Sequence, residues 1–214
     1  MKLILIAPSG GGKGSLAELI VKDFGIPNIS TGDIFRKNIK EGTPLGLKAE
    51  SFVNSGKWVP DELTIELLLD RLQHGDCKNG FILDGFPRTL NQAKVLAEKV
   101  DIDSVIELDI TDGLVMKRLG GRWMCKKCQY IWNTRFEGFT KDKCGKCGGE
   151  IYQRDDDKEE FIAKRLRQYR DANKDILNFY EEKGLLFTVP IGREYMPTDT
   201  YGVVSAYFKR KGLK

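Results

Sequence analysis

The sequence predicts an α/β fold in which helices flank a parallel five-stranded sheet. Two observations support this prediction: five short apolar runs alternate with segments of helical periodicity, and a glycine-rich turn joins the first run to the first helical segment. Strands that alternate with helices form parallel sheets through right-handed crossovers. Ligands of such sheets bind beyond the carboxyl ends of the strands, so we expect functional residues there.

Each apolar run is interpreted as a short buried strand. The strands are expected at residues 3–6, 27–30, 81–83, 105–108 and 185–189, of which 27–30 is the weakest. The spacing of apolar residues between these runs indicates helices, and a capping sequence that begins at Ser30 marks one of their starts. The helices are expected at about 13–24, 31–41, 45–54, 61–73, 89–99, 112–121, 157–183 and 199–210.

Two segments interrupt the alternation of strands and helices. Residues 30–59 are rich in helical signals but contain no long apolar run, as expected of a small helical flap. Residues 122–156 contain four of the five cysteines and little that could form a core. We therefore expect one core domain, made of residues 1–29, 60–121 and 157–214, with two insertions at 30–59 and 122–156.

Charge and composition argue against several classes of protein. With 35 basic and 31 acidic residues, a net charge of +4 does not suggest a nucleic-acid-binding stripe. No stretch approaches the roughly 20 apolar residues of a membrane span, and the first apolar run is too short for a signal peptide. We expect a cytoplasmic protein without nucleic-acid or membrane partners. The single histidine, His74, argues against catalysis by an imidazole base.

The turn after the first strand predicts a phosphate-binding loop. It reads Ala7-Pro-Ser-Gly-Gly-Gly-Lys-Gly-Ser15, and its glycines let backbone N–H groups and a helix N-terminus face one anion. Lys13 would follow the outer phosphates, and the Ser15 hydroxyl would reach a phosphate-bound Mg²⁺. The strict pattern has Gly in place of Ala7 and a hydroxyl in place of Gly14. A merely flexible glycine turn is the alternative.

The cysteines of the second insertion have the spacing of a metal site. Two C-x2-C pairs, Cys125 with Cys128 and Cys144 with Cys147, are separated by 15 residues. This spacing is typical of a zinc ribbon, and four thiolates leave no open position for a catalytic water. The sequence therefore predicts structural Zn²⁺, while iron and a redox thiol pair remain the alternatives.

An acidic and a basic residue follow the strand at 81–83. Asp84 would hold Mg²⁺ through a water ligand if this strand neighbours the first one. Arg88 and Gln92 share one face of the following helix, where one could bind a phosphate and the other a base. A helix cap for Asp84 and a surface ion pair for Arg88 are the plainer readings.

Further arginines lie near both insertions. Arg36 follows the capped helix start, Arg118 and Arg122 precede the cysteines at a spacing of four, and Arg154 and Arg165 follow them. Like charges at this helical spacing repel one another. A polyanionic ligand would remove that repulsion.

Together these motifs resemble the bacterial adenylate kinases of the long form, which carry a zinc-bearing lid. The resemblance covers nearly the whole chain. It rests on residues 10–15, 30–33 with Arg36, 56–62, 84–88 with Gln92, 121–122, and 154–157 with Arg165.

The resemblance implies reversible transfer of the terminal phosphoryl group of Mg-ATP to AMP, giving two ADP. The implied catalytic residues are Lys13, Arg88, Arg122, Arg154 and Arg165. The implied ATP-binding residues are Gly10, Gly11, Gly12, Lys13, Gly14, Ser15, Arg118, Arg122, Ile131, Trp132 and Arg193. The implied AMP-binding residues are Thr31, Arg36, Lys57, Trp58, Val59, Gly85, Phe86, Pro87, Arg88, Gln92, Arg154 and Arg165.

By the same resemblance, residues 30–59 form the AMP-binding flap and residues 122–156 the zinc-bearing lid of a monomer. The partners would be ATP, AMP and ADP, with Mg²⁺ and structural Zn²⁺ as cofactors. Another nucleoside monophosphate kinase, with UMP or CMP as acceptor or GTP as donor, is the nearest alternative. A zinc-ribbon nucleic-acid-binding NTPase and a redox sensor are the others.

Overall fold

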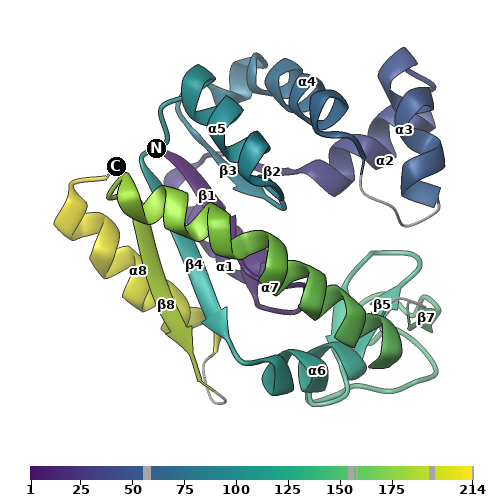
Figure 1. Ribbon diagram of the computed structural model, residues 1–214. Helices are drawn as coiled ribbons and strands as arrows, with labels where there is room; N and C mark the ends of the chain where they lie inside the picture. Colours follow the sequence, from purple (N-terminus) through teal and green to yellow (C-terminus); the bar gives the residue numbers. More distant parts are fainter. Residues whose placement is uncertain (55–58, 154–156, 158, 193–195, 214) are drawn as a thin grey trace. The chain divides into compact units, whose positions relative to one another are not determined.

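The computed structural model describes the whole chain except residues 55–58, 154–156, 158, 193–195 and 214 (Figure 1). The chain forms two compact units. The first contains residues 1–7, 12–109 and 172–214, and the second contains residues 8–11 and 110–171. In the described part of the chain, no helix has the length and apolar character needed to cross a membrane.

A five-stranded parallel sheet forms the centre of the first unit. Its strand order is β2(Asn28–Ser30), β3(Phe81–Asp84), β1(Lys2–Ile6), β4(Ser104–Ile110) and β8(Leu186–Ile191). Leu3, Ile82 and Val105 on its three central strands are fully buried, which explains why these strands appear in the sequence as continuous apolar runs. The predicted strands and the predicted fold class are therefore confirmed.

The register of the sheet brings together the residues that follow its strands. Asp84 at the end of β3 lies opposite Leu5 of β1 on one side and Ser30 of β2 on the other. The carboxyl ends of three neighbouring strands thus meet at one edge. This is the edge at which parallel sheets bind ligands.

Helices connect the strands of the first unit close to the predicted bounds. They are α1(Lys13–Phe24), α2(Thr31–Glu41), α3(Pro44–Asn54), α4(Asp61–Leu72), η1(Gly75–Cys77), α5(Leu90–Lys99), the end of α7(Glu159–Glu182), and α8(Pro197–Lys211). The Ser30 hydroxyl accepts a hydrogen bond from the Asp33 N–H at 3.4 Å, so the predicted cap of α2 is confirmed. Helices α1 and α8 pack together through an edge-to-face contact between Phe24 and Phe208.

The second unit contains an antiparallel sheet that the sequence does not predict. Strand β5(Arg122–Cys125) pairs with β6(Ile131–Asn133) on one side and with β7(Ile151–Tyr152) on the other. The unit also contains α6(Asp112–Gly120) and the first half of α7. Strands of two to four residues are too short to produce a readable alternation of apolar and polar side chains.

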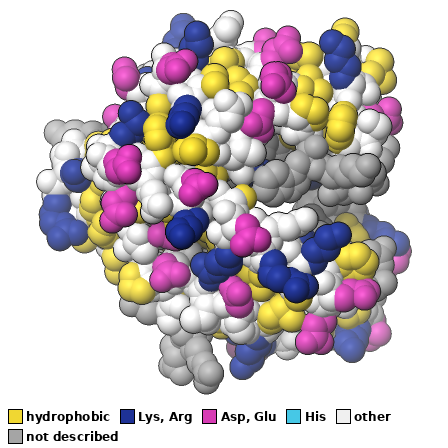
Figure 2. All heavy atoms as spheres, in the orientation of Figure 1, with side chains coloured by type: hydrophobic (Ala, Val, Ile, Leu, Met, Phe, Trp, Pro, Cys, Tyr) yellow, Lys and Arg dark blue, Asp and Glu magenta, His cyan; other side chains and the backbone are white. Residues whose placement is uncertain are grey.

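Charges of both signs are interspersed on one face of the molecular surface. On the face drawn in Figure 2, Lys and Arg side chains lie among Asp and Glu side chains. This distribution agrees with the small net charge of +4.

Candidate active site

The turn between β1 and α1 has the backbone of an anion-binding loop. Gly10 and Gly12 have φ values of 78° and 103°, a region that glycine enters without strain. A Cβ atom at Gly10 would lie 2.7 Å from the Leu119 side chain, so a larger residue would be strained and would force Leu119 to move. Gly12 caps α1 without any side-chain hydrogen bond, which leaves the N–H groups of the first turn available to a ligand.

Lys13 and Asp84 face each other at the carboxyl edge of the parallel sheet. The Lys13 Nζ atom donates a hydrogen bond to the Ala7 carbonyl at 2.7 Å and lies 3.8 Å from the Asp84 carboxylate. Strands β1 and β3 are neighbours, as the expectation for Asp84 required. Gly14 and Ser15 are exposed in the first turn of α1. A cation and an anion therefore meet beside the glycine-rich loop.

The segment after β3 forms a compact set of hydrogen bonds. The Gly85 carbonyl accepts hydrogen bonds from the Thr31 hydroxyl at 3.0 Å and from Arg88 Nε at 2.8 Å. Phe86 and Pro87 are buried, Arg88 is exposed, and the Val59 side chain is half-buried. The structure thus brings Thr31, Gly85 and Arg88 together, as the AMP-site prediction requires.

Gln92 is held on both sides of its carboxamide. Its oxygen accepts a hydrogen bond from the Arg88 N–H at 2.7 Å, and its nitrogen donates one to Asp61 at 2.7 Å. The other Asp61 oxygen accepts hydrogen bonds from Thr89 and Asn91. Asp61 belongs to the 56–62 motif, but the sequence gives it no role in the site, because Gln92 lies 31 positions away and only the fold brings the two together.

Arg36 lies on α2 with its side chain exposed. It forms an ion pair with Asp33 one turn earlier. This is the surface pair expected of adjacent charges on a helix. A phosphate that binds Arg36 would have to compete with Asp33.

Arginines of the second unit contact the loop at residues 8–11. Arg118 donates to the Gly11 carbonyl at 3.4 Å, and Arg165 donates to the Ser9 hydroxyl at 2.5 Å. Burial, together with the nearby charge of Arg135, lowers the pKa of Arg118. Partly buried guanidinium groups therefore lie next to part of the predicted phosphate-binding loop.

Arg122 forms a buried ion pair within the same unit. Its Nε and one terminal nitrogen donate to the two Asp157 oxygens at 2.7 and 2.5 Å. The Asp157 side chain is only 1% exposed, so this carboxylate depends on Arg122 for compensation of its charge. The pairing fixes the direction in which Arg122 leaves the start of β5.

The four cysteines of the two C-x2-C pairs form one cluster. All four Sγ atoms lie within 4.8 Å of one another, with 3.5 Å between Cys125 and Cys147 and 3.7 Å between Cys128 and Cys144. A tetrahedral ion with metal–sulfur bonds of about 2.3 Å requires sulfur atoms about 3.8 Å apart. The cluster therefore fits one tetrahedral metal ion.

Trp132 packs against this cluster. Its indole N–H donates to Cys144 Sγ at 3.3 Å. Burial raises the pKa of the Cys144 thiol, but the hydrogen bonds from Trp132 and from nearby backbone N–H groups outweigh burial and lower the pKa to about 6. The neighbouring Ile131 side chain is 50% exposed. The indole N–H of Trp132 thus points at the cysteine cluster. The ATP contacts predicted for Ile131 and Trp132 stay predictions.

Four of the predicted site residues lie outside the described residues. They are Lys57, Trp58, Arg154 and Arg193.

Comparison with known proteins decides the family. The family model for adenylate kinase matches residues 5–185. This chain belongs to the adenylate kinase family. It is 44% identical to an adenylate kinase of Caldicellulosiruptor bescii over 212 residues, which cover 96% of this chain and 98% of the relative. It is 48% identical to an adenylate kinase of Bacillus cytotoxicus over 195 residues, which cover 88% and 90%.

As an adenylate kinase, the chain is a nucleoside monophosphate kinase that converts ATP and AMP reversibly into two ADP. The reaction requires that charge on the phosphates be neutralised and that the reacting oxygens be aligned, and it needs little acid–base chemistry. The candidate site contains Lys13 and several arginines but no histidine, which suits this adenylate kinase reaction. The functional prediction made from the motifs is therefore confirmed.

Proposed function

We propose that this adenylate kinase binds the ATP phosphates on residues 10–15 and AMP on the segment after β3. The observation that carries the proposal is the position of Lys13, whose ammonium group lies beside both the glycine-rich loop and Asp84. Lys13 would follow the transferred phosphoryl group and stabilise its charge in the transition state. Backbone N–H groups at the start of α1 would hold the phosphates in place.

The proposed AMP site is built on α2 and on the turn between β3 and α5. Thr31, Gly85 and Arg88 are joined by hydrogen bonds, which supports a single binding surface. Arg36 and Arg88 would bind the AMP phosphate, and Gln92 would contact the base. The remaining proposed AMP contacts are Lys57, Trp58, Val59, Phe86, Pro87, Arg154 and Arg165.

Arginines supply the rest of the proposed catalytic charge. Arg88, Arg122, Arg154 and Arg165 would surround the transferred phosphoryl group, and Arg118 would lie against the adenine of ATP. The remaining proposed ATP contacts are Ile131, Trp132 and Arg193. Residues 30–59 and 122–156 would act as the flap over AMP and the lid over ATP, because phosphoryl transfer must exclude water as a competing acceptor.

Two metal ions belong to the proposal. Mg²⁺ bound with ATP neutralises charge on the phosphate oxygens, and Asp84 would hold it through a water ligand with Ser15 nearby. Structural Zn²⁺ would be held by Cys125, Cys128, Cys144 and Cys147, whose sulfur spacing supports a tetrahedral ion. The proposed enzyme is a cytoplasmic monomer that binds neither nucleic acid nor membranes.

One set of assays tests substrates and metals together. The protein is incubated with Mg-ATP or Mg-GTP and with AMP, GMP, UMP or CMP, and each nucleotide product is quantified. We expect two ADP for each ATP consumed with AMP, and much lower turnover with the other pairs. Elemental analysis of the same sample should give about one zinc per chain. One iron per chain, or faster turnover with UMP, would contradict the proposal.

A further inference from the structure

We propose that Asp61 sets the base specificity of the acceptor site by holding the Gln92 carboxamide in one of its two orientations. The inference deepens the AMP site proposed above and rests on its assignment of Gln92 to the base. Asp61 is a positioning residue in this account, since it acts through Gln92 and not on the substrate.

The partners of Gln92 fix which way its carboxamide points. Asp61 accepts from the nitrogen at 2.7 Å, and the Arg88 N–H donates to the oxygen at 2.7 Å. An ionised carboxylate can only accept hydrogen bonds and a backbone N–H can only donate them. Rotating the carboxamide by half a turn would place two donors together and two acceptors together. Because Gln92 is 3% exposed, water could not repair both contacts.

Asp61 is itself held in place by three hydrogen-bond donors. Its second oxygen accepts from the Thr89 hydroxyl at 2.7 Å and from the Asn91 amide at 3.1 Å. Thr89 caps α5 through the Gln92 N–H, while Asp61 is the first residue of α4. The carboxylate thus joins the starts of two helices and has little freedom to turn away from Gln92.

The orientation matters because adenine and the 6-oxopurines present opposite patterns to a carboxamide. Adenine offers an N6–H donor beside the N1 acceptor, whereas guanine and hypoxanthine offer an O6 acceptor beside an N1–H donor. After its two internal hydrogen bonds, Gln92 retains one N–H and one acceptor site for a base. A carboxamide free to rotate could pair with either pattern. A carboxamide held by Asp61 and Arg88 can match only one of them.

Asp61→Ala tests this inference directly. We measure kcat and KM with AMP and with IMP at saturating ATP, and KM for ATP in a separate titration at saturating AMP. The variant should show about a tenfold higher KM for AMP and about a tenfold smaller preference for AMP over IMP, with KM for ATP unchanged. Asp61→Asn replaces one acceptor oxygen by an NH2 donor, so it cannot accept from both Gln92 and Asn91, and its preference should fall between those of the unaltered enzyme and of Asp61→Ala. An unchanged preference in Asp61→Ala would overturn the inference.

Two further variants distinguish the proposed orientation of Gln92 by Asp61 from a general destabilisation of the first turns of α4 and α5. Asn91→Ala removes one hydrogen bond to Asp61 but keeps the contact with Gln92, so its AMP preference should be unchanged. A loss equal to that of Asp61→Ala would overturn the inference. If Asp61→Ala does not fold, Asp61→Glu keeps the charge and moves the oxygens by one methylene. At least a threefold loss of preference is then expected, and no loss would contradict the inference.

Gln92→Ala distinguishes failure of this inference from failure of the proposed AMP site. If Gln92 contacts the base, this variant loses the preference for AMP whatever Asp61 does. If Gln92→Ala keeps the preference, the proposed AMP site is wrong and the inference falls with it. If Gln92→Ala loses the preference while Asp61→Ala keeps it, only the role of Asp61 is wrong.

Discussion

Single side chains at the sheet edge determine how charge is arranged before any nucleotide binds. The Lys13 ammonium group is directed by the Ala7 carbonyl and lies near the Asp84 carboxylate. If ATP phosphates bind beside Lys13 as proposed, the ammonium group would need little reorganisation, and preorganised charge is an effective form of transition-state stabilisation.

Lys13→Met tests the catalytic role of this charge. Methionine has a similar length but no charge, so the chemical step should slow by at least about 100-fold, or about 3 kcal/mol. Rapid-quench measurement of a single turnover isolates that step from product release. A circular-dichroism melt close to that of the unaltered enzyme serves as the control for folding. Turnover within a few-fold of normal would refute the assignment.

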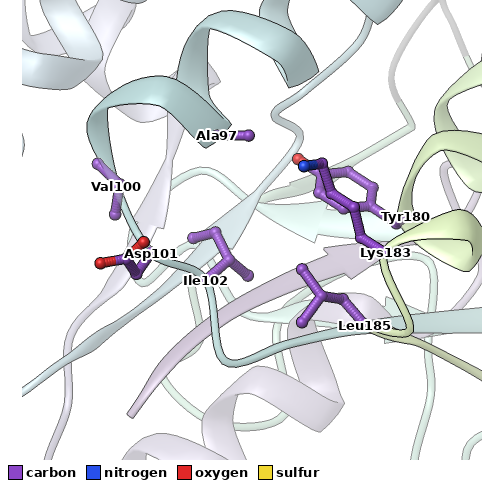
Figure 3. Close-up of a pocket in the computed structure, with 7 residues that line it drawn as sticks. All are labelled: Ala97, Val100, Asp101, Ile102, Tyr180, Lys183 and Leu185. Carbon is purple, nitrogen blue, oxygen red and sulfur yellow. The ribbon is translucent and has the colours of Figure 1, made fainter.

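Tyr180 is an isolated polar group in the first unit. Its side chain is 1% exposed, and its hydroxyl has no hydrogen-bond partner among the described residues. Burial raises the pKa of Tyr180. The residue borders a cavity of about 140 Å³ between the α5–β4 connection and the α7–β8 connection (Figure 3). The cavity is lined by Ala97, Val100, Asp101, Ile102, Tyr180, Lys183 and Leu185.

Removal of the Tyr180 hydroxyl should therefore not lower the free energy of unfolding. An unpaired buried hydroxyl carries a desolvation penalty of roughly 1–3 kcal/mol without a compensating hydrogen bond. We expect Tyr180→Phe to leave the free energy of unfolding unchanged or to raise it by about 1 kcal/mol, as measured by urea titration. Tyr207→Phe is the matched comparison, because the Tyr207 hydroxyl lies 3.0 Å from the Ser104 hydroxyl. Loss of this hydrogen bond should lower the free energy of unfolding of the Tyr207→Phe variant. Equal losses in both variants would contradict this view.

At the scale of elements, β5 depends on one ion pair as well as on its strand partners. Arg122 opens the strand and its side chain is mostly buried against Asp157. A buried pair contributes modestly to stability, but removing one partner leaves an unpaired charge. The start of β5 is therefore sensitive to the loss of a single carboxylate.

Asp157→Ala should lower the free energy of unfolding by about 3 kcal/mol, because Arg122 would remain partly buried without its partner. Urea unfolding followed by circular dichroism gives the value. Asp112→Ala provides a control in the same unit, because the ion pair of Asp112 with Arg170 is half exposed. Its loss should lower the free energy of unfolding by less than about 1 kcal/mol. Similar losses for the two variants would show that burial of Asp157 does not matter.

The sequence predicted those elements that have a strong local pattern. Residues that are close together in the sequence are enough to recognise the apolar runs of β1, β3 and β4, the glycines around Lys13 and the cap at Ser30. The spacing of the four cysteines predicted their cluster. Strands β5 to β7 were missed because they are short and mix buried with partly exposed side chains, whereas the equally short β3 is a continuous run of buried apolar residues. The contact of Asp61 with Gln92 was missed because it depends on how α4 packs beside α5.

For the whole molecule, the two units differ in what holds them together. The first is built around a buried parallel sheet, whereas the described core of the second includes Cys125 and Cys144 beside Trp132 and Ile151. The cysteine-bearing segment 122–152 has little buried apolar surface, so it would depend on the proposed zinc for much of its stability. Metal loss should therefore affect the two units unequally.

Chelation of the proposed zinc should lower the melting temperature and leave most activity at 10 °C. The proposed zinc would stabilise the folded state by mass action and would take no part in phosphoryl transfer. Hydrogen exchange should become faster in residues 122–152 and stay slow in β1 and β3. Restoring Zn²⁺ should reverse both effects. Immediate loss of turnover in a folded, metal-free sample would indicate that the metal does more than stabilise.

The indole of Trp132 gives the second unit an optical property of its own. Two of the three tryptophans, Trp123 and Trp132, lie in that unit, and Trp132 donates its N–H directly to a cysteine sulfur. A sulfur atom in contact with an excited indole quenches the indole fluorescence. Coordination of that sulfur to a metal ion changes the quenching. We therefore expect the tryptophan emission of the unlabelled protein to change when the cysteine cluster binds or loses a metal ion.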